Sequence, residues 1–445
     1  MSSKEQEAIY SVKDLNKGKV AVLGLQHMFA MFGATVLVPI LTGLDVSTTL
    51  LFAGVGTLLF HLLTKRKVPA FLGSSFAFLG GYAAIAPMTD GVSNVEKIPY
   101  ACFGVACAGL LYLIMALLIK LFSAKRIMKF FPPIVTGPII IAIGLILSKS
   151  AIDNCTSNWW IALIAILTVI LCNIFGKGMI KIVPILLGVI ASYLVAVIFG
   201  QVDFTGVKEA AWIGLPFVKD MTVLGLFGEN FDASYLLTAV ITIMPIAFAT
   251  IVEHIGDISA ISSTVGKNYI KDPGLHRTLL GDGIATIVAS LFGAPANTTY
   301  GENTGVLNLT KVFDPMVIRL AAIFAIFFSF CPKFAAVIQA MPTATVGGIS
   351  LILYGMISAV GVRNVVENKV DFTKSRNVII AALILVLSIG IYYSAAGAIS
   401  IKLGELVISF SGLAVGALAG IFLNAVLPGK DYVFEEEQQE EKKAI

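Results

Sequence analysis

Long apolar runs restrict the fold of this chain more than any other feature. A helix needs about 17 to 25 mostly apolar residues to cross a hydrocarbon layer roughly 30 Å thick, and such runs recur from Val20 to the region of Leu427. Hydrophobic residues make up 57% of the 445 positions and charged residues only 13%, a balance that soluble domains do not reach. We therefore expect an all-α polytopic protein of a plasma or inner membrane, surrounded by the lipid bilayer.

Read in order, the runs predict about 14 spans. The 19 residues before the first run are too polar for a secretory signal, so we expect the spans themselves to direct insertion. Basic residues cluster at 65–67, 120–129, 177–181, 267–277 and 363–376. If each cluster lies in a cytoplasmic loop, both termini are cytoplasmic. The expected spans lie near residues 20–42, 48–64, 69–87, 100–121, 132–150, 159–175, 182–200, 234–261, 278–292, 294–308, 314–338, 342–360, 378–395 and 403–427.

Two of the expected spans, the third and the tenth, are interrupted by glycine and proline. Each is the third segment of a seven-segment half, and because seven is odd the two halves would have opposite orientations. This pattern is typical of inverted-repeat transporters, whose broken segments meet near the midplane and bind substrate there. The alternative is a purely structural role for both segments, which the matching positions disfavour. The interruptions are Pro69, Gly73, Gly80, Gly81 and Pro87 in the third span, and Pro295, Gly301 and Gly305 in the tenth.

Three acids inside expected spans indicate a candidate site. Glu253 and Asp257 are four residues apart in the eighth span and share a helix face, while Glu302 lies in the interrupted tenth span. Acids within spans are rare and usually face a substrate or ion pathway. The alternative is a wet vestibule at the end of the helix, mainly for Asp257. Carboxylates can accept N–H bonds from a neutral ligand and can bind a proton when they are desolvated or crowded.

Other patterns narrow the class of protein. Phe76 and Tyr300 place aromatic rings on the two broken segments, where they can stack on a flat ligand or simply pack. None of the other three histidines lies at ligand spacing from His254, which argues against a metal site. The sequence at 279–283, LLGDG, lacks the first glycine of the intramembrane aspartyl protease signature. We expect no cofactor and no nucleic-acid partner.

Six long stretches carry a resemblance to a known family. The chain resembles the nucleobase–cation symporter-2, or nucleobase–ascorbate transporter, family over nearly its whole length, and within it the bacterial uracil permeases. The stretches are LQHMFAMFGATVLVPI (25–40), KVPAFLGSSFAF (67–78), VEHIGD (252–257), KDPGLHR (271–277), NTTYGEN (297–303) and GGISLILYGMISAVGVR (347–363).

The resemblance implies an architecture. It consists of 14 transmembrane segments in two inverted repeats of seven, with short antiparallel β-strands in segments 3 and 10 that pair at mid-membrane. Segments 1–4 (residues 1–121) and 8–11 (234–338) would form a core domain, and segments 5–7 (122–200) and 12–14 (339–428) a gate domain that can mediate homodimers. An extracellular connection would cover 201–233, and an acidic cytoplasmic tail 429–445.

The resemblance also implies roles for individual residues. Asp257 occupies the family's proton-coupling position, which is a histidine in uracil permeases and an aspartate in other branches. Aspartate has an unperturbed pKa of about 3.9 against about 6.5 for histidine, so the coupled proton could reside on Asp257, Glu253 or Glu302. The substrate contacts would be Glu253 and Glu302 accepting N–H bonds, Phe76 and Tyr300 lining the pocket, backbone groups of Phe76 and Gly301 binding carbonyls, and Ala34 closing the site against the ring.

We therefore expect a proton-coupled importer of uracil that works by alternating access and is not an enzyme. The nearest rival is a permease for xanthine or another purine base. An anion transporter of the same design would need a cationic group or open helix N-termini at its site, and the two glutamates argue against this alternative. A membrane-embedded hydrolase would need an assembled nucleophile and base, which the sequence does not show.

Overall fold

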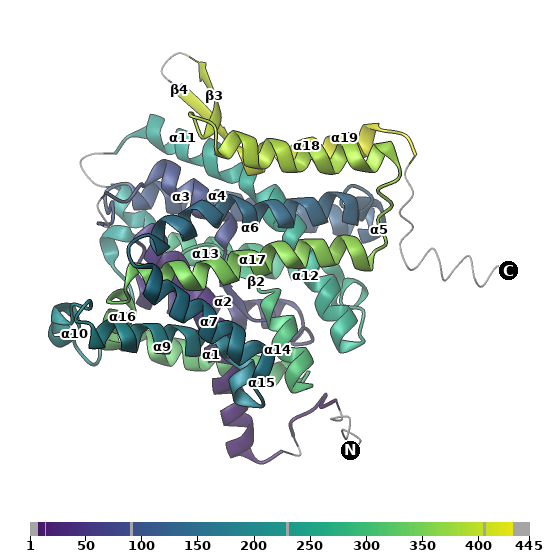
Figure 1. The fold of residues 1–445 in the computed structure, drawn as a ribbon. Helices are drawn as coiled ribbons and strands as arrows, with labels where there is room; N and C mark the ends of the chain where they lie inside the picture. Colours follow the sequence, from purple (N-terminus) through teal and green to yellow (C-terminus); the bar gives the residue numbers. More distant parts are fainter. Residues whose placement is uncertain (1–7, 14, 90–91, 228–230, 404–405, 430–445) are drawn as a thin grey trace.

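The structure is a computed structural model that describes residues 8–13, 15–89, 92–227, 231–403 and 406–429. Within these ranges, the side chains of Lys125, Glu302, Asn303 and positions 402–403 and 406–408 lie outside the description. The described chain is mostly helical, as its apolar runs predict, and helices surround a small sheet near the centre of the molecule (Figure 1).

Seven of the described helices are long and apolar enough to cross a membrane. They are α1 (Lys17–Thr42), α2 (Val46–Leu63), α4 (Ile98–Phe122), α6 (Pro133–Cys155), α17 (Thr343–Glu367), α18 (Ser375–Tyr392) and the unit of α11 (Ala233–Ile243), η4 (Met244–Ile246) and α12 (Ala247–Val265). Shorter helices are η1 (Phe76–Phe78) with α3 (Leu79–Ile85), α7 (Trp159–Phe175), α9 (Pro184–Ile198), α13 (Leu275–Leu291), α14 (Glu302–Thr310) and α19 (Gly412–Val426). One-turn helices α5 (Ala124–Met128), α8 (Met179–Ile182) and α10 (Thr205–Glu209) lie between them.

Prolines break two of the expected spans. In the eighth, Pro245 lies in the short turn η4 that separates α11 from α12. In the eleventh, α15 (Pro315–Ser329) and α16 (Pro332–Gln339) are bent by 89° at a break that Pro332 follows. Proline lacks the N–H that would continue the helix and is favoured at a helix start. Counted as one span, the bent pair raises the number of candidate spans to eight.

The last expected span, 403–427, begins too early. Residues before α19 form a hairpin of β3 (Ala398–Leu403) and β4 (Leu406–Ser411), and the helix itself begins at Gly412. The hairpin projects from one end of the molecule (Figure 1). The sequences AISIKL and LVISFS alternate branched apolar residues with polar ones, which favours a strand over a helix. This second sheet was not expected, because the apolar content of the segment concealed its period.

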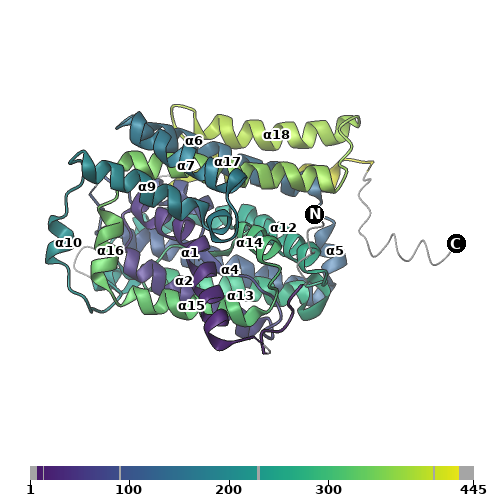
Figure 2. The same cartoon turned by 60° about the horizontal axis from the view of Figure 1, so that its bottom comes forward.

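Helices α6, α17 and α18 pack together along one side of the molecule (Figures 1 and 2). Glycine allows the close approach of α6 to α17: a Cβ on Gly144 would lie 2.2 Å from the carbonyl oxygen of Tyr354. Small residues at such crossings let helices approach in a membrane, where dispersion forces rather than water exclusion hold them together. Helices α6 and α17 form one wall of the pocket described below.

The central sheet joins two segments that are far apart in the sequence. Strand β1 (Leu72–Ser74) pairs antiparallel with β2 (Asn297–Thr299), with Gly73 opposite Thr298. Each strand leads directly into a helix, β1 into η1 and α3, and β2 into α14. The interruptions in the third and tenth expected spans therefore correspond to two short strands that satisfy each other's backbone groups, as buried backbone requires.

Candidate functional site

Neutral hydrogen bonds from α2 hold β1 in place. The backbone N–H of Leu72 donates to the hydroxyl of Thr57 at 2.9 Å, and this hydroxyl lies 3.2 Å from the carbonyl oxygen of Leu72. His61 Nε2 lies 2.9 Å from the carbonyl oxygen of Ala70, just before the strand. All of these groups are buried. The edge of β1 that does not face β2 thus finds its partners on a helix.

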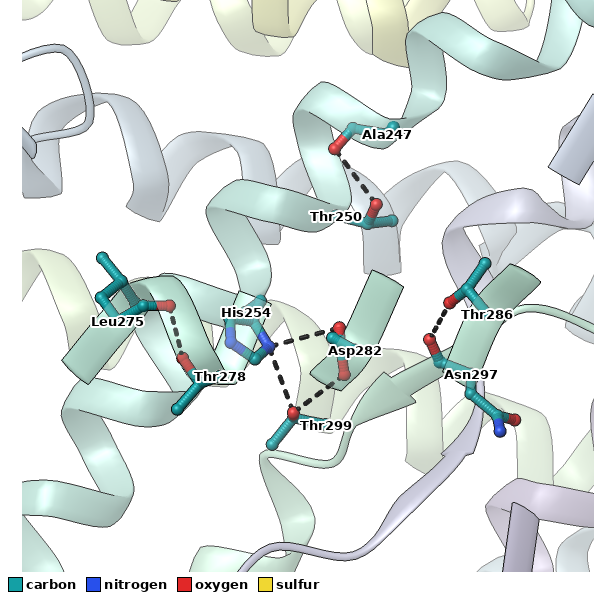
Figure 3. A network of polar contacts seen from close by, with 9 residues as sticks. All are labelled: Ala247, Thr250, His254, Leu275, Thr278, Asp282, Thr286, Asn297 and Thr299. Atoms are coloured by element: carbon teal, nitrogen blue, oxygen red, sulfur yellow. Dashed lines mark hydrogen bonds and ion pairs between the residues drawn. The ribbon is translucent and has the colours of Figure 1, made fainter. Parts of the chain in front are cut away.

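Side-chain hydrogen bonds also hold β2. Thr286 on α13 donates its hydroxyl to the carbonyl oxygen of Asn297 at 2.6 Å (Figure 3). The side-chain amide of Asn297 donates to the carbonyl oxygen of Phe52 on α2 at 2.7 Å. Helices α2 and α13 therefore flank the sheet, and each contributes a threonine hydroxyl that binds the backbone of one strand.

A buried triangle of polar groups, formed by His254, Asp282 and Thr299, lies behind β2 (Figure 3). His254 Nδ1 is 3.2 Å from Asp282 Oδ2 and 3.2 Å from the hydroxyl of Thr299, which in turn donates to Asp282 Oδ1 at 3.1 Å. The side chains of His254 and Asp282 are fully inaccessible to solvent. A proton on Nδ1 would point this nitrogen's N–H toward Asp282. The sequence analysis considered His254 only as a metal ligand and therefore missed this pairing.

A pocket opens beside β2, where α12 faces α6 and α17. It contains about 410 Å³ of space between atoms, including the part open to solvent. One wall is polar and the opposite wall is apolar. The polar wall consists of Glu253, Asp257, Thr298, Thr299 and Gly301, the apolar wall of Ile140, Ile357 and Val360, and the aromatic residues are Phe76 and Tyr300.

Contacts with β1 fix the ring of Tyr300. Its backbone N–H donates to the carbonyl oxygen of Phe71 at 3.2 Å, and its hydroxyl donates to that of Ser74 at 3.1 Å. The ring covers Gly73, where a Cβ would lie 2.5 Å from ring atoms. Phe76 is held edge-on against Tyr354, with ring centroids 5.6 Å apart. Both aromatic side chains are therefore positioned before any ligand binds.

The carboxylate of Asp257 lies against the start of α14. A Cβ on Gly301 would be only 2.6 Å from Asp257 Oδ1. The first N–H groups of a helix lack partners within the helix and carry partial positive charge. The start of α14 thus presents donors to the same space that the acids of α12 line, and it favours negative charge there.

The structure brings five of the seven expected site residues around one pocket: Phe76, Glu253, Asp257, Tyr300 and Gly301. Ala34 is buried in α1, one residue before Thr35, whose carbonyl oxygen accepts a hydrogen bond from Ser74; it is not among the residues that line the pocket. Glu302 begins α14, and its side chain lies outside the described residues. The sequence analysis missed Thr298, Thr299 and the three apolar residues of α6 and α17.

Comparisons with known proteins identify the family. Residues 18–397 match the sequence model Xan_ur_permease, described as the Permease family. The chain belongs to this family. Because its relatives are permeases and its helices are long and apolar, this permease is an integral membrane protein and not an enzyme.

Several relatives are similar over nearly their whole length. The uracil permease of Bacillus caldolyticus is 40% identical over 436 residues, which cover 95% of this chain and 96% of the relative. A probable uracil permease of Haemophilus influenzae is 40% identical over 422 residues, covering 93% and 95%. The uracil permease of Bacillus subtilis is 39% identical over 418 residues, covering 91% of each.

Solved structures show that the fold is shared more widely. The transmembrane domain of the cyanobacterial bicarbonate transporter BicA matches with a TM-score of 0.57 at 15% identity, covering 94% of this chain and 99% of that domain. SLC26A9 matches with a TM-score of 0.62 at 12% identity, covering 94% of this chain and 66% of that protein. At such low identity the likeness concerns the fold alone.

Proposed function

We propose that this permease imports uracil together with protons. The observation that carries the proposal is the 40% identity to a uracil permease over 95% of the chain. The pocket supports it, because acids, backbone donors and aromatic rings line the same space. A uracil ring offers two N–H donors and two carbonyl acceptors, which complement carboxylates and N–H groups respectively.

In this proposal, Glu253 and Glu302 accept the N–H bonds of the base. The backbone N–H groups at the starts of η1 and α14, at Phe76 and Gly301, bind its carbonyl oxygens, since the first N–H groups of a helix need partners from outside it. Phe76 and Tyr300 line the pocket against the ring, and Ala34, which does not line the pocket in this structure, would close the site once the base is bound. The carboxylates then bind the N–H groups of the base, and the helix starts bind its carbonyl oxygens.

Protonation of an acid among Asp257, Glu253 and Glu302 would couple the proton gradient to uptake. Glu253 and Asp257 both line the pocket, and acids that share a site cannot all carry charge cheaply. A proton bound from outside would favour the loaded state, and its loss to the cytoplasm would favour release.

The finer architecture belongs to the same proposal. The seven long helices, the bent pair, the four shorter apolar helices, α13 and β2 with α14 supply 14 segments, in keeping with two inverted repeats of seven. Core segments (1–121 and 234–338) would move against gate segments (122–200 and 339–428), with 201–233 outside and 429–445 inside. Both termini would be cytoplasmic, and the gate domain would mediate a homodimer.

Uptake of labelled uracil into proteoliposomes, with and without an inward proton gradient, tests the function. We expect faster uptake with the gradient. Uptake at the same rate with and without the gradient would contradict proton coupling. Absence of uptake would contradict uracil as the substrate. Competition by unlabelled xanthine separates the purine alternative, because a purine permease would be inhibited by xanthine more strongly than by uracil.

Asp257→Asn tests the coupling step. Asparagine keeps the size of the side chain and one acceptor oxygen, but its amide cannot exchange a proton near neutral pH. We expect uracil binding within about tenfold of the wild type, a change of at most about 1.4 kcal/mol, while uptake loses its response to the proton gradient. A variant that is still driven by the gradient to the wild-type extent would show that the coupled proton resides elsewhere.

A further inference from the structure

The side chain of Thr298 lies on the opposite face of β2 from its two neighbours. Asn297 and Thr299 point into the surrounding helices, where their side chains bind the carbonyl oxygen of Phe52 and the His254–Asp282 pair (Figure 3). Successive side chains of a strand point to opposite faces. Thr298 therefore faces the other way, and it lines the pocket.

The hydroxyl of Thr298 is buried without a hydrogen-bond partner among the described residues. Thr298 is only 4% exposed, and its Oγ1 contacts no described donor or acceptor. By contrast, the hydroxyls of Thr57, Thr286 and Thr299 around the same sheet are all bonded. Leaving a buried hydroxyl unpaired costs roughly 1–3 kcal/mol, so a group of this kind at a binding pocket points to a partner that arrives with the ligand.

The neighbours of Thr298 on the same face of the sheet are Gly73 and Tyr300. Gly73 lies directly opposite Thr298 in the sheet, and directly opposite residues share a face. Because glycine has no side chain, the ring of Tyr300 covers that position instead. Tyr300 is also two residues after Thr298 and so belongs to the same face. This face therefore presents a flat aromatic ring with a hydroxyl next to it.

No neutral hydroxyl competes with Thr298 for a ligand at the described pocket. The hydroxyl of Thr299 is already bonded to His254 and Asp282, and the opposite wall of Ile140, Ile357 and Val360 is apolar. Glu253 and Asp257 can donate a hydrogen bond only when they are protonated, whereas a threonine hydroxyl can donate in either protonation state of the acids. A carbonyl oxygen on the ligand needs a donor, and a threonine hydroxyl can supply one.

We propose that Thr298 is a specificity-determining residue, whose hydroxyl donates a hydrogen bond to a ring carbonyl oxygen of the transported base. This inference rests on the proposed function, since it takes the ligand to be a nucleobase with carbonyl groups. Through this bond the pocket selects for a carbonyl oxygen at one ring position and against sulfur, a weaker acceptor, at the same position.

The test compares Thr298→Val and Thr298→Ser with the wild type in binding of uracil, 2-thiouracil and 4-thiouracil. Valine has nearly the shape of threonine and is favoured in strands, so it removes the hydroxyl with little effect on the sheet. We expect the valine variant to bind uracil about 5- to 20-fold more weakly, the effect of losing one hydrogen bond. For the thio analogue whose sulfur replaces the carbonyl oxygen that Thr298 binds, the valine variant and the wild type should have nearly equal affinities.

The serine variant keeps the hydroxyl and should stay within about threefold of the wild type for all three ligands, a difference of roughly 0.7 kcal/mol. Thr310→Val is the matched control, because the hydroxyl of Thr310 binds the carbonyl oxygen of Val306 within α14 and does not line the pocket. Its affinity for uracil should not change. Thermal unfolding of each variant in detergent reports whether the fold is retained, and Thr298→Ala replaces the valine variant if that one unfolds.

Two results would overturn the inference while the proposed function stands. One is uracil affinity within twofold of the wild type in a folded Thr298→Val protein. The other is an equal loss for uracil and both thio analogues, which would indicate a general distortion of the pocket. A wild-type protein that binds none of the three ligands overturns the proposed function itself, and the two failures are therefore distinguishable.

Discussion

The two strand-to-helix segments at the centre of this permease share a backbone design but differ in chemistry. Strand β1 is held by neutral groups, the hydroxyl of Thr57 and the imidazole of His61, bonded to backbone. Strand β2 is held by a hydroxyl as well, but also by the buried ionisable pair of His254 and Asp282. The two strands pair in one sheet, but the acidic groups next to it lie on the β2 side.

The same asymmetry extends to the pocket. The segment around β1 contributes an aromatic ring, Phe76, while Glu253, Asp257, Thr298 and Gly301 all come from α12 and the segment around β2. The β1 segment thus supplies one aromatic ring, whereas α12 and the β2 segment supply the acids, a hydroxyl and the other aromatic ring, Tyr300. Substitutions in the two regions should therefore have different consequences.

The largest difference is expected between Asp282→Leu and Thr57→Val. Leucine removes the carboxylate that contacts His254 and accepts from Thr299, so two buried polar groups lose a partner, at a cost of about 1–3 kcal/mol each. Valine at position 57 removes neutral hydrogen bonds, at a cost of about 1–3 kcal/mol. Thermal unfolding of both variants in the same detergent compares them, and uracil binding should be lost only in the first. Equal destabilisation by the two substitutions would show that the buried pair stabilises the fold no more than the neutral hydrogen bonds of Thr57 do.

Gly301→Ala should weaken uracil binding strongly with a smaller effect on stability. The added Cβ would lie 2.6 Å from Asp257 Oδ1, so the carboxylate or the start of α14 must move. A displacement of about 1 Å at a binding site can cost as much as 100-fold, and we expect a loss of at least tenfold, measured by binding of labelled uracil.

Gly305→Ala is the matched control for that substitution. It lies on the same helix, and a Cβ there would meet no atom within 4 Å. Alanine is also the better helix former by roughly 1 kcal/mol, so this variant should bind uracil normally and be at least as stable as the wild type. Normal binding by Gly301→Ala would mean that the close approach to Asp257 has no bearing on the ligand.

The broken segments could be recognised from sequence because several glycines and prolines inside an apolar run are incompatible with a continuous transmembrane helix. Glu253 and Asp257 could be placed on one face because helix periodicity fixes a spacing of four, and the structure has both at the pocket. The hairpin β3–β4 was missed because its alternation is short and apolar. Pairings such as His254 with Asp282, 28 positions apart, depend on how α12 packs against α13, which no local pattern encodes.

Thr298 could have been predicted in part. Once 297–299 is known to be a strand, alternation alone separates Thr298 from its neighbours. The sequence does not show which face of the strand points toward the pocket, because that depends on which helices flank the sheet. The apolar wall of Ile140, Ile357 and Val360 was missed for a related reason: these residues look like any others in their spans, and only the packing of α6 and α17 brings them to the pocket.

The smallest effect is expected for an exposed ion pair that links the two regions. Lys67, just before β1, contacts both carboxylate oxygens of Asp272, in the connection between α12 and α13, at 2.6 and 2.5 Å. The side chains are 44% and 62% exposed, and exposed pairs of this kind contribute little because water and salt screen them. The contrast with the buried His254–Asp282 pair is therefore one of burial rather than of chemical type.

Lys67→Met tests this contrast through its pH dependence. The hydrogen bonds from the Lys67 ammonium lower the pKa of Asp272. A carboxyl whose pKa is depressed on folding stabilises the protein above its unfolded pKa, about 3.9, and loses that contribution as the pH falls through the lower folded value. The thermal midpoint of the variant should thus fall slightly below the wild type at pH 7 and coincide with it once Asp272 is protonated. A gap as large as that of Asp282→Leu, or one that widens on acidification, would show that burial is not what separates the two pairs.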